Sequence, residues 1–285
     1  MLTPVRLFCE AEHLIHYFFT LFMIHSLHYF FAFFFASLLL IPAPALHAQS
    51  PDTEDERARE IFEKLDERRT AITYETSTLE MKIIDSRERV RTRTMRTYSF
   101  SEDEATKSLT VFESPADVRG TGLLNLNEGG NETQLLYLPA IGRVQTVSGS
   151  QRTERFLGSD FTFEDLGNQN PEDFEFELVN ETEEKITLKA TPLEDSQYAY
   201  IHFFIDAEKL VLLRAEYFNS SDVQIKELTA SEYQHIRDEI WRPDVMIMRD
   251  LKADRRTELR WNERTFDEAI PDRYFTERHL QRGLQ

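Results

Sequence analysis

The feature that most constrains this chain is an alternation of apolar and polar side chains with a period of two, which begins near Ala71. In residues 79–83, for example, Leu79, Met81 and Ile83 alternate with charged side chains. Because successive side chains of a strand point to opposite faces, this pattern predicts half-buried β-strands. Similar runs separated by turn residues recur along most of the remaining chain. They predict about ten or eleven strands in a meandering antiparallel sheet, closed or half-closed.

One predicted strand differs from the others. Residues 198–205 (YAYIHFFI) are apolar at nearly every position. A strand with two apolar faces is covered on both sides. The sequence therefore predicts a further layer outside the sheet at this strand.

A helix is predicted before the strands. Ser50 suits an N-cap, and the acidic residues that follow complement the positive end of the helix dipole. Ala58, Ile61, Phe62 and Leu65 then share one face at helical spacing. This amphipathic helix requires an apolar surface to lie on. A second, short helix is predicted near the C-terminal end.

Residues 1–48 have the pattern of an export leader. Residues 29–41 are apolar or small, and prolines and small side chains follow them. An apolar core of this length before small residues is typical of a signal peptide, with cleavage after Ala45 or Ala48.

The start and the fate of this leader have alternatives. Met23 is a second possible start and leaves a leader of ordinary length, while an apolar run at 14–24 makes an uncleaved N-terminal membrane anchor the alternative to cleavage. Residues 49–285 suffice for a single β domain with a full core. The single cysteine, Cys9, lies in the leader, so the mature chain is predicted to lack disulfides and thiolate metal sites.

The charge of the chain argues against one class of partner. The formal net charge is −18, and residues 49–285 carry 32 basic and 49 acidic residues. A surface of this sign repels phosphate backbones, so no nucleic-acid partner is predicted.

Residues 137–166 are the least generic run, yet they contain no nucleophile–base pair, phosphate loop or metal-ligand spacing. Asp160, Glu164 and Asp165 are candidates for a hard-metal site or a carboxylate pair. Without further oxygen or histidine ligands at suitable spacing, salt bridges to nearby arginines and capping of turns are favoured. No catalytic residue, metal or cofactor is therefore predicted.

The aromatic residues favour a binding cavity, with an ordinary core as the alternative. Ten aromatic residues after the leader exceed what one thin sheet face requires, namely Phe156, Phe161, Phe163, Phe174, Phe176, Phe203, Phe204, Phe218, Trp241 and Phe275. Burying an acyl chain of about 16 carbons would contribute about 12 kcal/mol at ~0.8 kcal/mol per CH₂. A carrier therefore requires an apolar cleft and a lid. Arg87, Arg89, Arg91 and Arg93 share one strand face, which is either a rim for an anionic head group or a solvated face that discourages edge pairing.

Three segments resemble one known family, the LolA-like outer-membrane lipoprotein-sorting proteins. They are residues 112–124 (FESPADVRGTGLL), 137–143 (YLPAIGR) and 156–166 (FLGSDFTFEDL). Weaker matches follow at Lys226, 241–243, Thr257 and 270–280. Where a tryptophan is frequent in the family this chain has leucines 135 and 136, and Gln145 and Thr146 stand where basic residues are frequent.

The resemblance implies a mainly β fold, a half-open antiparallel β-barrel with an N-terminal helix and short helices covering the opening. It also implies a carrier in the periplasm of a Gram-negative bacterium. Such a carrier binds the acyl chains of a lipid or lipoprotein in an apolar cavity and sorts it towards the outer membrane. Some relatives are associated with inner-membrane lipid-exporting transporters. The alternative is thus a non-enzymatic module that docks on such a transporter, with its barrel filled by its own side chains. A hydrolase that uses Asp160 or Glu164 ranks third.

Two sets of residues carry these expectations. The cavity and lid candidates are Ile61, Phe62, Leu65, Phe112, Leu124, Phe161, Phe203 and Trp241. The motif residues expected to tie loops together or to allow tight backbone approach are Arg119, Gly120, Arg143, Gly158, Asp160 and Asp165.

Overall fold

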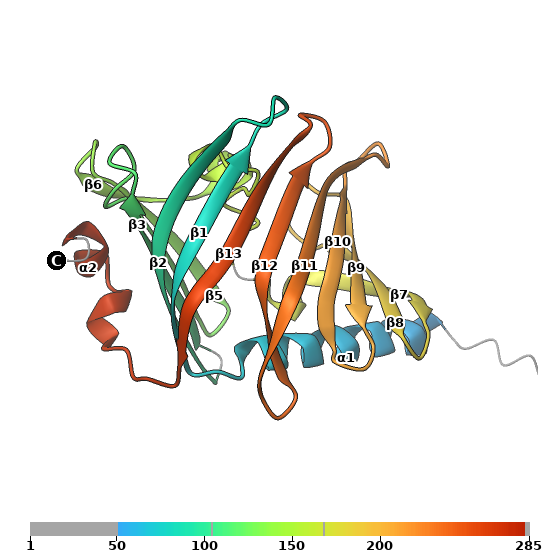
Figure 1. Cartoon of the computed structure of the whole chain (residues 1–285). Helices are drawn as coiled ribbons and strands as arrows, with labels where there is room; N and C mark the ends of the chain where they lie inside the picture. Colours follow the sequence, from blue (N-terminus) through green and yellow to red (C-terminus); the bar gives the residue numbers. More distant parts are fainter. Residues whose placement is uncertain (1–50, 104, 168, 283–285) are drawn as a thin grey trace, which may run out of the picture. The chain divides into compact units, whose positions relative to one another are not determined.

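The structure, a computed structural model, describes residues 51–103, 105–167 and 169–282 (Figure 1). The chain divides into two compact units, Met1–Ala48 and Gln49–Gln285, and the described residues belong to the second. The predicted leader therefore lies outside the described residues. Within the described part of the chain, no helix has both the length and the apolar character needed to cross a membrane.

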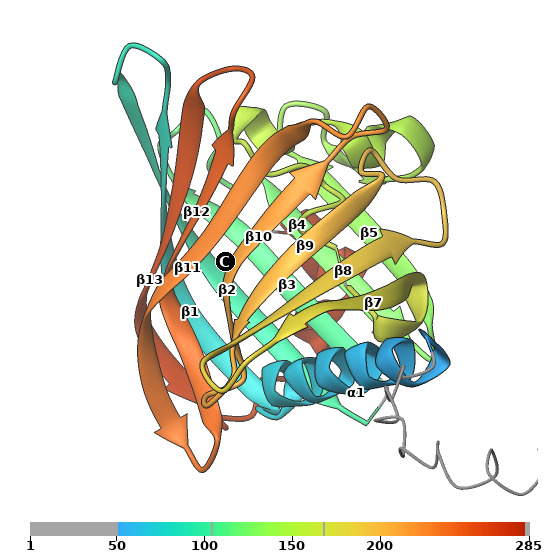
Figure 2. The ribbon, with the colours of Figure 1, turned by 90° about the vertical axis from the view of Figure 1, so that its right-hand side faces the viewer.

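Thirteen antiparallel strands form one sheet, in the order β6-β5-β4-β3-β2-β1-β13-β12-β11-β10-β9-β8-β7. Nearly all pairs join strands that are consecutive in the chain, and β13 returns to pair with β1. In the described part of the chain the edge strands β6 and β7 do not pair, so the sheet curves without closing (Figures 1 and 2). This confirms the prediction of a mainly β, half-open antiparallel fold. The strands are β1 (Tyr74–Ile84), β2 (Val90–Glu102), β3 (Ala105–Ser114), β4 (Gly122–Glu128), β5 (Asn131–Leu138), β6 (Arg143–Thr146), β7 (Phe174–Glu181), β8 (Lys185–Pro192), β9 (Tyr200–Asp206), β10 (Val211–Phe218), β11 (Gln224–Arg237), β12 (Ile240–Asp250) and β13 (Arg255–Phe266).

The strand count exceeds the predicted ten or eleven because the sheet includes segments too short for an alternation to identify. Strand β6 has four residues and no fully buried side chain. Its extended conformation is fixed by the ladder to β5, in which Leu135 pairs with Thr146 and Leu138 with Arg143. Pairing with a neighbour, rather than the local pattern, therefore defines this strand.

Helix α1 (Pro51–Thr70) lies across one end of the curved sheet, beside β7 (Figure 2). The predicted apolar face is buried, because Ala58, Ile61 and Phe62 are at most 5% exposed. The ring of Phe62 lies 4.5 Å from that of Phe176 and 5.3 Å from that of Phe203. The helix thus finds the apolar surface that its sequence pattern requires, on the inner face of β7 and β9.

The C-terminal end of α1 is held by an arginine from β12. The guanidinium of Arg242 donates hydrogen bonds to the carbonyl oxygens of Arg68 and Arg69, at 3.0 and 2.9 Å. These carbonyls belong to the last turn of the helix, where no backbone N–H group of the helix is available to donate to them. A buried side chain of the sheet therefore fixes this end of α1.

A second apolar cluster lies on the outer face of the sheet, away from α1. It is formed by Leu109, Val111 and Leu124 with Ile270, Phe275 and Leu280. The last three residues come from the C-terminal segment, which contains the 3-10 turn η4 (Asp272–Phe275) and α2 (Glu277–Arg282). A side chain at Gly122 of β4 would lie 2.6 Å from the Leu280 side chain, so glycine allows this close packing. The predicted short C-terminal helix exists, but it covers the outer face instead of the opening.

The predicted outer layer over residues 198–205 is wrong. Strand β9 has a regular alternation, with Ile201, Phe203 and Ile205 buried towards the interior. On its other face the ring of Phe204 lies 4.0 Å from the guanidinium of Arg214. The ring of Tyr200 stacks on Phe218 of β10. Neighbouring side chains, rather than a second layer, cover the apolar groups of this face.

Candidate functional site

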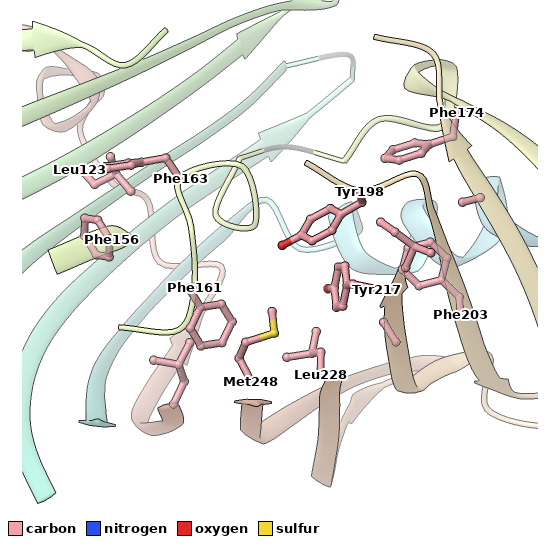
Figure 3. Close-up of a cluster of buried hydrophobic side chains, with 14 of the residues drawn as sticks. Leu123, Phe156, Phe161, Phe163, Phe174, Tyr198, Phe203, Tyr217, Leu228 and Met248 are labelled. Carbon is pink, nitrogen blue, oxygen red and sulfur yellow. The ribbon is translucent and has the colours of Figure 1, made fainter. Parts of the chain in front are cut away.

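The interior of the curved sheet is crossed by the segment between β6 and β7, residues 147–173 without 168, here called the inner loop (Figure 3). It contains the 3-10 turns η1 (Gly149–Thr153), η2 (Phe156–Gly158) and η3 (Pro171–Asp173). Its side chains Phe156, Phe161 and Phe163 are at most 6% exposed and belong to the main core cluster. The inner loop therefore fills much of the space that a ligand would occupy in an open barrel.

Polar side chains on the inner face of the sheet hold the backbone of this loop. Asn125 donates a hydrogen bond to the Leu166 carbonyl at 2.9 Å, and Gln134 donates to the Phe163 carbonyl at 3.1 Å. Arg93 donates to the carbonyl of Leu157 at 2.8 Å. Because these donors are buried, their partners on the loop stabilise its position inside the sheet.

The prediction that four arginines share one strand face is wrong, because Arg87 and Arg89 lie in the turn between β1 and β2. Arg93 of β2 is buried, whereas the other three arginines are exposed. Arg89 forms an ion pair with Asp85 at 2.6 Å within the same hairpin. Arg93 therefore has a structural contact inside the sheet, whereas the other three arginines face solvent.

Asp160 is fully buried and is the first of two carboxylates that tie the inner loop to the sheet. Its Oδ1 atom lies 2.6 Å from Nε of Arg255, and Thr257 donates a hydrogen bond to Oδ2 at 2.7 Å. The Asp160 amide in turn donates to the Thr257 hydroxyl at 2.9 Å. Burial raises the pKa of Asp160, while the hydrogen bond from Thr257 and the charge of Arg255 oppose that shift. These contacts join the inner loop to β13.

Replacing Asp160 by asparagine is expected to change how stability depends on pH. Because burial raises the pKa of folded Asp160 above its ordinary value of 3.8, the folded protein binds more protons than the unfolded chain in the acid range. The contribution of this carboxyl to the free energy of unfolding therefore grows as pH falls towards 3.8 and shrinks as pH rises through the folded pKa. Urea unfolding of both proteins from neutral to acid pH should show the wild type gaining relative stability on acidification. Parallel pH profiles would contradict this.

Asp165 is the second tying carboxylate and has a cationic partner from β11. Lys226 Nζ lies 2.9 Å from Asp165 Oδ2, and both side chains are at most 7% exposed. Tyr198 donates its hydroxyl proton to Asp165 Oδ1 at 2.6 Å, and Lys226 donates to the Tyr198 oxygen at 2.8 Å. Burial, with a further contribution from Asp165, raises the pKa of Tyr198 well above 10.0, so its phenol stays protonated at neutral pH.

The third acidic residue of the motif, Glu164, is also engaged. It accepts hydrogen bonds from the hydroxyl of Ser196 and, at 3.0 Å, from the amide of Gln197. Within the described residues there is no group of three or more histidine, cysteine, aspartate or glutamate side chains arranged for a metal ion. The structure thus places these carboxylates in contacts within the protein.

An apolar pocket of about 160 Å³ lies between α1 and the sheet. Four of the predicted cavity residues line it, namely Phe62, Leu65, Phe203 and Trp241. The rest of its apolar wall comes from Leu210, Val211, Leu212, Pro243 and Met246. These residues belong to α1 and to β9, β10 and β12 with the turns beside them, so the helix forms one side of the pocket and the sheet the other.

The other predicted cavity residues lie elsewhere. Ile61, Phe112 and Phe161 are buried in the main core, where the ring of Phe112 lies 5.7 Å from that of Phe156. Leu124 belongs to the outer cluster, because it follows Leu123 in β4 and successive strand residues point to opposite faces. Leu123 is the residue of this pair that faces the interior (Figure 3).

A larger pocket, of about 440 Å³, lies between the inner loop, the β5–β6 edge and the connection between β8 and β9. Its lining is rich in carboxylates, namely Glu132, Glu164, Asp165, Asp173, Glu194 and Asp195. Arg152 is the one basic residue among its lining residues and lies 3.8 Å from Glu132. These charged groups make the larger pocket less suited to an acyl chain than the pocket beneath α1.

The remaining motif residues have different surroundings. Arg119 donates a hydrogen bond to the Glu113 carbonyl at 2.9 Å, within its own loop. Gly120 and Gly158 have φ of 79° and 76°, which glycine adopts without strain. Arg143 is exposed and forms no ion pair with the described residues.

The local sequence does not identify Arg255 of β13, which pairs with Asp160, or Tyr198 before β9, which donates a hydrogen bond to Asp165. Lys226 and Thr257 were noted only as weak family matches. Each partner is distant in sequence: Arg255, for example, is more than 90 residues from Asp160. The available signal was a charged residue within an alternating strand, which also fits a solvated face, so only the tertiary structure identifies these pairs.

Comparisons with known proteins agree with this fold. A family model described as "uncharacterized protein" matches residues 104–282, more than half of the chain. A solved Vibrio parahaemolyticus domain described as an outer membrane lipoprotein-sorting protein is 28% identical, with a TM-score of 0.75 over 80% of this chain and 99% of that one. A DUF1329 family protein from Desulfovibrio piger is 27% identical, with a TM-score of 0.73 over 78% and 97%.

A third solved structure supports the fold alone. A LolA superfamily protein from Nitrosomonas europaea is 21% identical, with a TM-score of 0.60 over 77% of this chain and 97% of that one. None of the curated proteins matches the chain by sequence.

Proposed function

Because the chain belongs to the LolA-like family of outer-membrane lipoprotein-sorting proteins, we propose that it is a carrier for an acyl chain of a lipid or lipoprotein. The observation that supports this most directly is the apolar pocket beneath α1. An alkyl chain in this pocket is shielded from water by Phe62 and Leu65 on the helix side and by Phe203 and Trp241 on the sheet side. Each buried CH₂ group would contribute about 0.8 kcal/mol to binding.

Helix α1 is the lid in this proposal. Its C-terminal end is fixed by Arg242, whose side chain is 11% exposed. Towards its N-terminal end it is held by Arg59, which donates to the carbonyls of Pro171 and Phe174, and by an exposed ion pair between Arg57 and Glu181. Exposed ion pairs contribute roughly 0–1 kcal/mol. The N-terminal part of α1 is thus expected to lift first, with the Arg242 end as the hinge.

The surroundings of the carrier follow from the same family. We place the protein in the periplasm of a Gram-negative bacterium, exported by the leader predicted over residues 1–48, cleaved or retained as an anchor. The cargo would be passed on towards the outer membrane, and an inner-membrane transporter is the proposed donor. The buried carboxylates Asp160, Glu164 and Asp165 have structural partners, and the proposed function is non-enzymatic.

One observation favours the second candidate function, an accessory module that docks on a transporter without carrying lipid. The inner loop places Phe156, Phe161 and Phe163 inside the sheet, so the barrel is largely filled by its own side chains. A docking module requires only a stable fold, whereas a carrier requires that α1 can open.

Native mass spectrometry with lipid extraction distinguishes the two functions. Protein purified from a bacterial periplasm is expected to retain an amphiphile at near-stoichiometric level, or to take one up when it is added. Replacement of the bound amphiphile by an added fatty acid would confirm that binding is reversible. If the purified protein has the mass of the ligand-free chain and also binds no added lipid, the carrier function is rejected and the docking module is favoured.

A further inference from the structure

The size of the apolar pocket limits what it can hold. An empty apolar cavity of about 150 Å³ accommodates a molecule the size of benzene, whereas pockets for larger ligands measure about 300–1,000 Å³. The pocket beneath α1 has about 160 Å³ and is bounded on the inner side by packed core. Its cross-section is therefore suited to part of one alkyl chain.

Within the described residues, the interior beyond this pocket is poorly suited to a second alkyl chain. The inner loop is fixed from several strands, by Arg93 at Leu157, Arg255 at Asp160 and Lys226 at Asp165. The larger pocket beyond this loop is lined by six carboxylates and would leave an alkyl chain among charged groups. Opening α1 thus lengthens the apolar pocket along the helix but does not create room for a second alkyl chain beside the first.

Charged side chains line the apolar pocket at the C-terminal end of α1. Its three arginines are paired with carboxylates: Arg68 with Glu239, Arg69 with Asp66 at 2.5 Å and Arg242 with Glu75 at 3.5 Å. The ammonium group of Lys209 lies 4.9 Å from the ring of Trp241, which forms part of the pocket wall. Lys209 forms no ion pair with the described part of the chain. Among these cations, Lys209 is therefore the positive charge that an anionic head group would meet at this end of the pocket.

Resting on the proposed carrier function, we infer that the ligand has a single alkyl chain and an anionic head group. The chain lies between α1 and β9, β10 and β12. The head group lies at the C-terminal end of α1, near the ammonium group of Lys209. A lipid with two or three chains exceeds the pocket, and a cationic or zwitterionic head group lacks the favourable contact at its mouth.

The test compares three phospholipids that share the palmitoyl chain. Palmitoyl lysophosphatidylglycerol has one chain and an anionic head, dipalmitoyl phosphatidylglycerol adds a second chain, and palmitoyl lysophosphatidylcholine replaces the head by a zwitterion. Native mass spectrometry of the purified protein with equimolar mixtures is expected to show one bound lysophosphatidylglycerol, at an affinity about tenfold above either alternative.

Two variants locate the site, and each has a matched control on the exposed β12–β13 turn. Leu65→Trp fills the pocket and should abolish binding, whereas Leu251→Trp makes the same change at a residue that is 46% exposed and should not. Lys209→Gln should weaken binding of lysophosphatidylglycerol several-fold and leave lysophosphatidylcholine unchanged. Lys252→Gln removes an exposed positive charge and should change neither. Circular dichroism verifies that all four variants are folded.

The outcomes separate the inference from the proposed function. Equal or tighter binding of the two-chain lipid would overturn the single-chain inference and leave the carrier intact. Equal binding of both one-chain lipids, or an unchanged affinity in Lys209→Gln, would overturn the assignment of the head group. Binding that survives Leu65→Trp would overturn the location. If no amphiphile binds, the carrier function itself fails.

Discussion

Replacing Lys226 by methionine is expected to destabilise the protein by about 3–5 kcal/mol, because it leaves a buried carboxylate without its cation. Asp165 is 2% exposed at its side chain and lies on the inner loop, 2.9 Å from Lys226 Nζ. Methionine has a similar length and keeps the packing against the core. The hydrogen bond that Lys226 donates to Tyr198 at 2.8 Å is lost as well. The free energy of unfolding by urea, from linear extrapolation, measures the effect.

An exposed ion pair is the matched control for this variant. Arg256 and Glu88 lie 2.8 Å apart, at side-chain exposures of 36% and 69%. Replacing Arg256 by methionine should cost less than about 1 kcal/mol, since solvent screens this pair. Equal losses in the two variants would show that the burial of the pair between Lys226 and Asp165 is not what stabilises the inner loop.

Replacing Phe62 by alanine is expected to have an effect of similar size on stability, about 3–5 kcal/mol. Phe62 is 5% exposed and its ring contacts Phe174, Phe176 and Phe203, so truncation removes most of the apolar contact between the middle of α1 and the sheet. It also enlarges the pocket beneath the helix, which Phe62 lines. In a carrier, the variant should accept bulkier acyl chains than the wild type, measured by displacement of a fluorescent fatty acid.

Phe275 provides the control for this second variant. It is 7% exposed and packs in the outer cluster, 6.3 Å from the ring of Phe100, so Phe275→Ala removes the same atoms without touching the pocket. Both variants should lose stability, and Phe62→Ala alone should change the preference for chain size. If the two variants bind the same acyl chains equally well, the pocket beneath α1 is not the binding site, and the docking module is favoured.

Much of the fold was predictable because it depends on local side-chain periodicity. The alternation in β1, with Leu79, Met81 and Ile83 on one face, is the pattern of its buried side chains in the structure. The face of α1 that contains Ala58, Ile61 and Phe62 is likewise buried as predicted. Such patterns survive in the fold because burying one face of an element is the main source of its stability.

The candidate site was less predictable, because apolar residues with the same local pattern lie in different places, some in the pocket wall and others away from it. Phe203 and Trp241 line the pocket, whereas Phe112 and Phe161 do not, although Phe203 belongs to the same core cluster as those two. Nothing in their local sequence separates the two pairs. Leu124 was misplaced for a simpler reason. Both Leu123 and Leu124 are apolar, so the sequence of β4 does not show which of the two faces the interior until the neighbouring strands are known.

The sequence by itself determined the class of the protein: an acidic chain with an amphipathic helix, a run of antiparallel strands and the motif of residues 156–166. These are properties of short segments, and each follows from the order of neighbouring side chains. Only the tertiary structure decided that this motif forms a loop inside the sheet, tied by Arg255 and Lys226. The physical reason is that both the ion pairs and the size of the pocket depend on how strands far apart in the chain curve towards one another, and no local pattern encodes that distance.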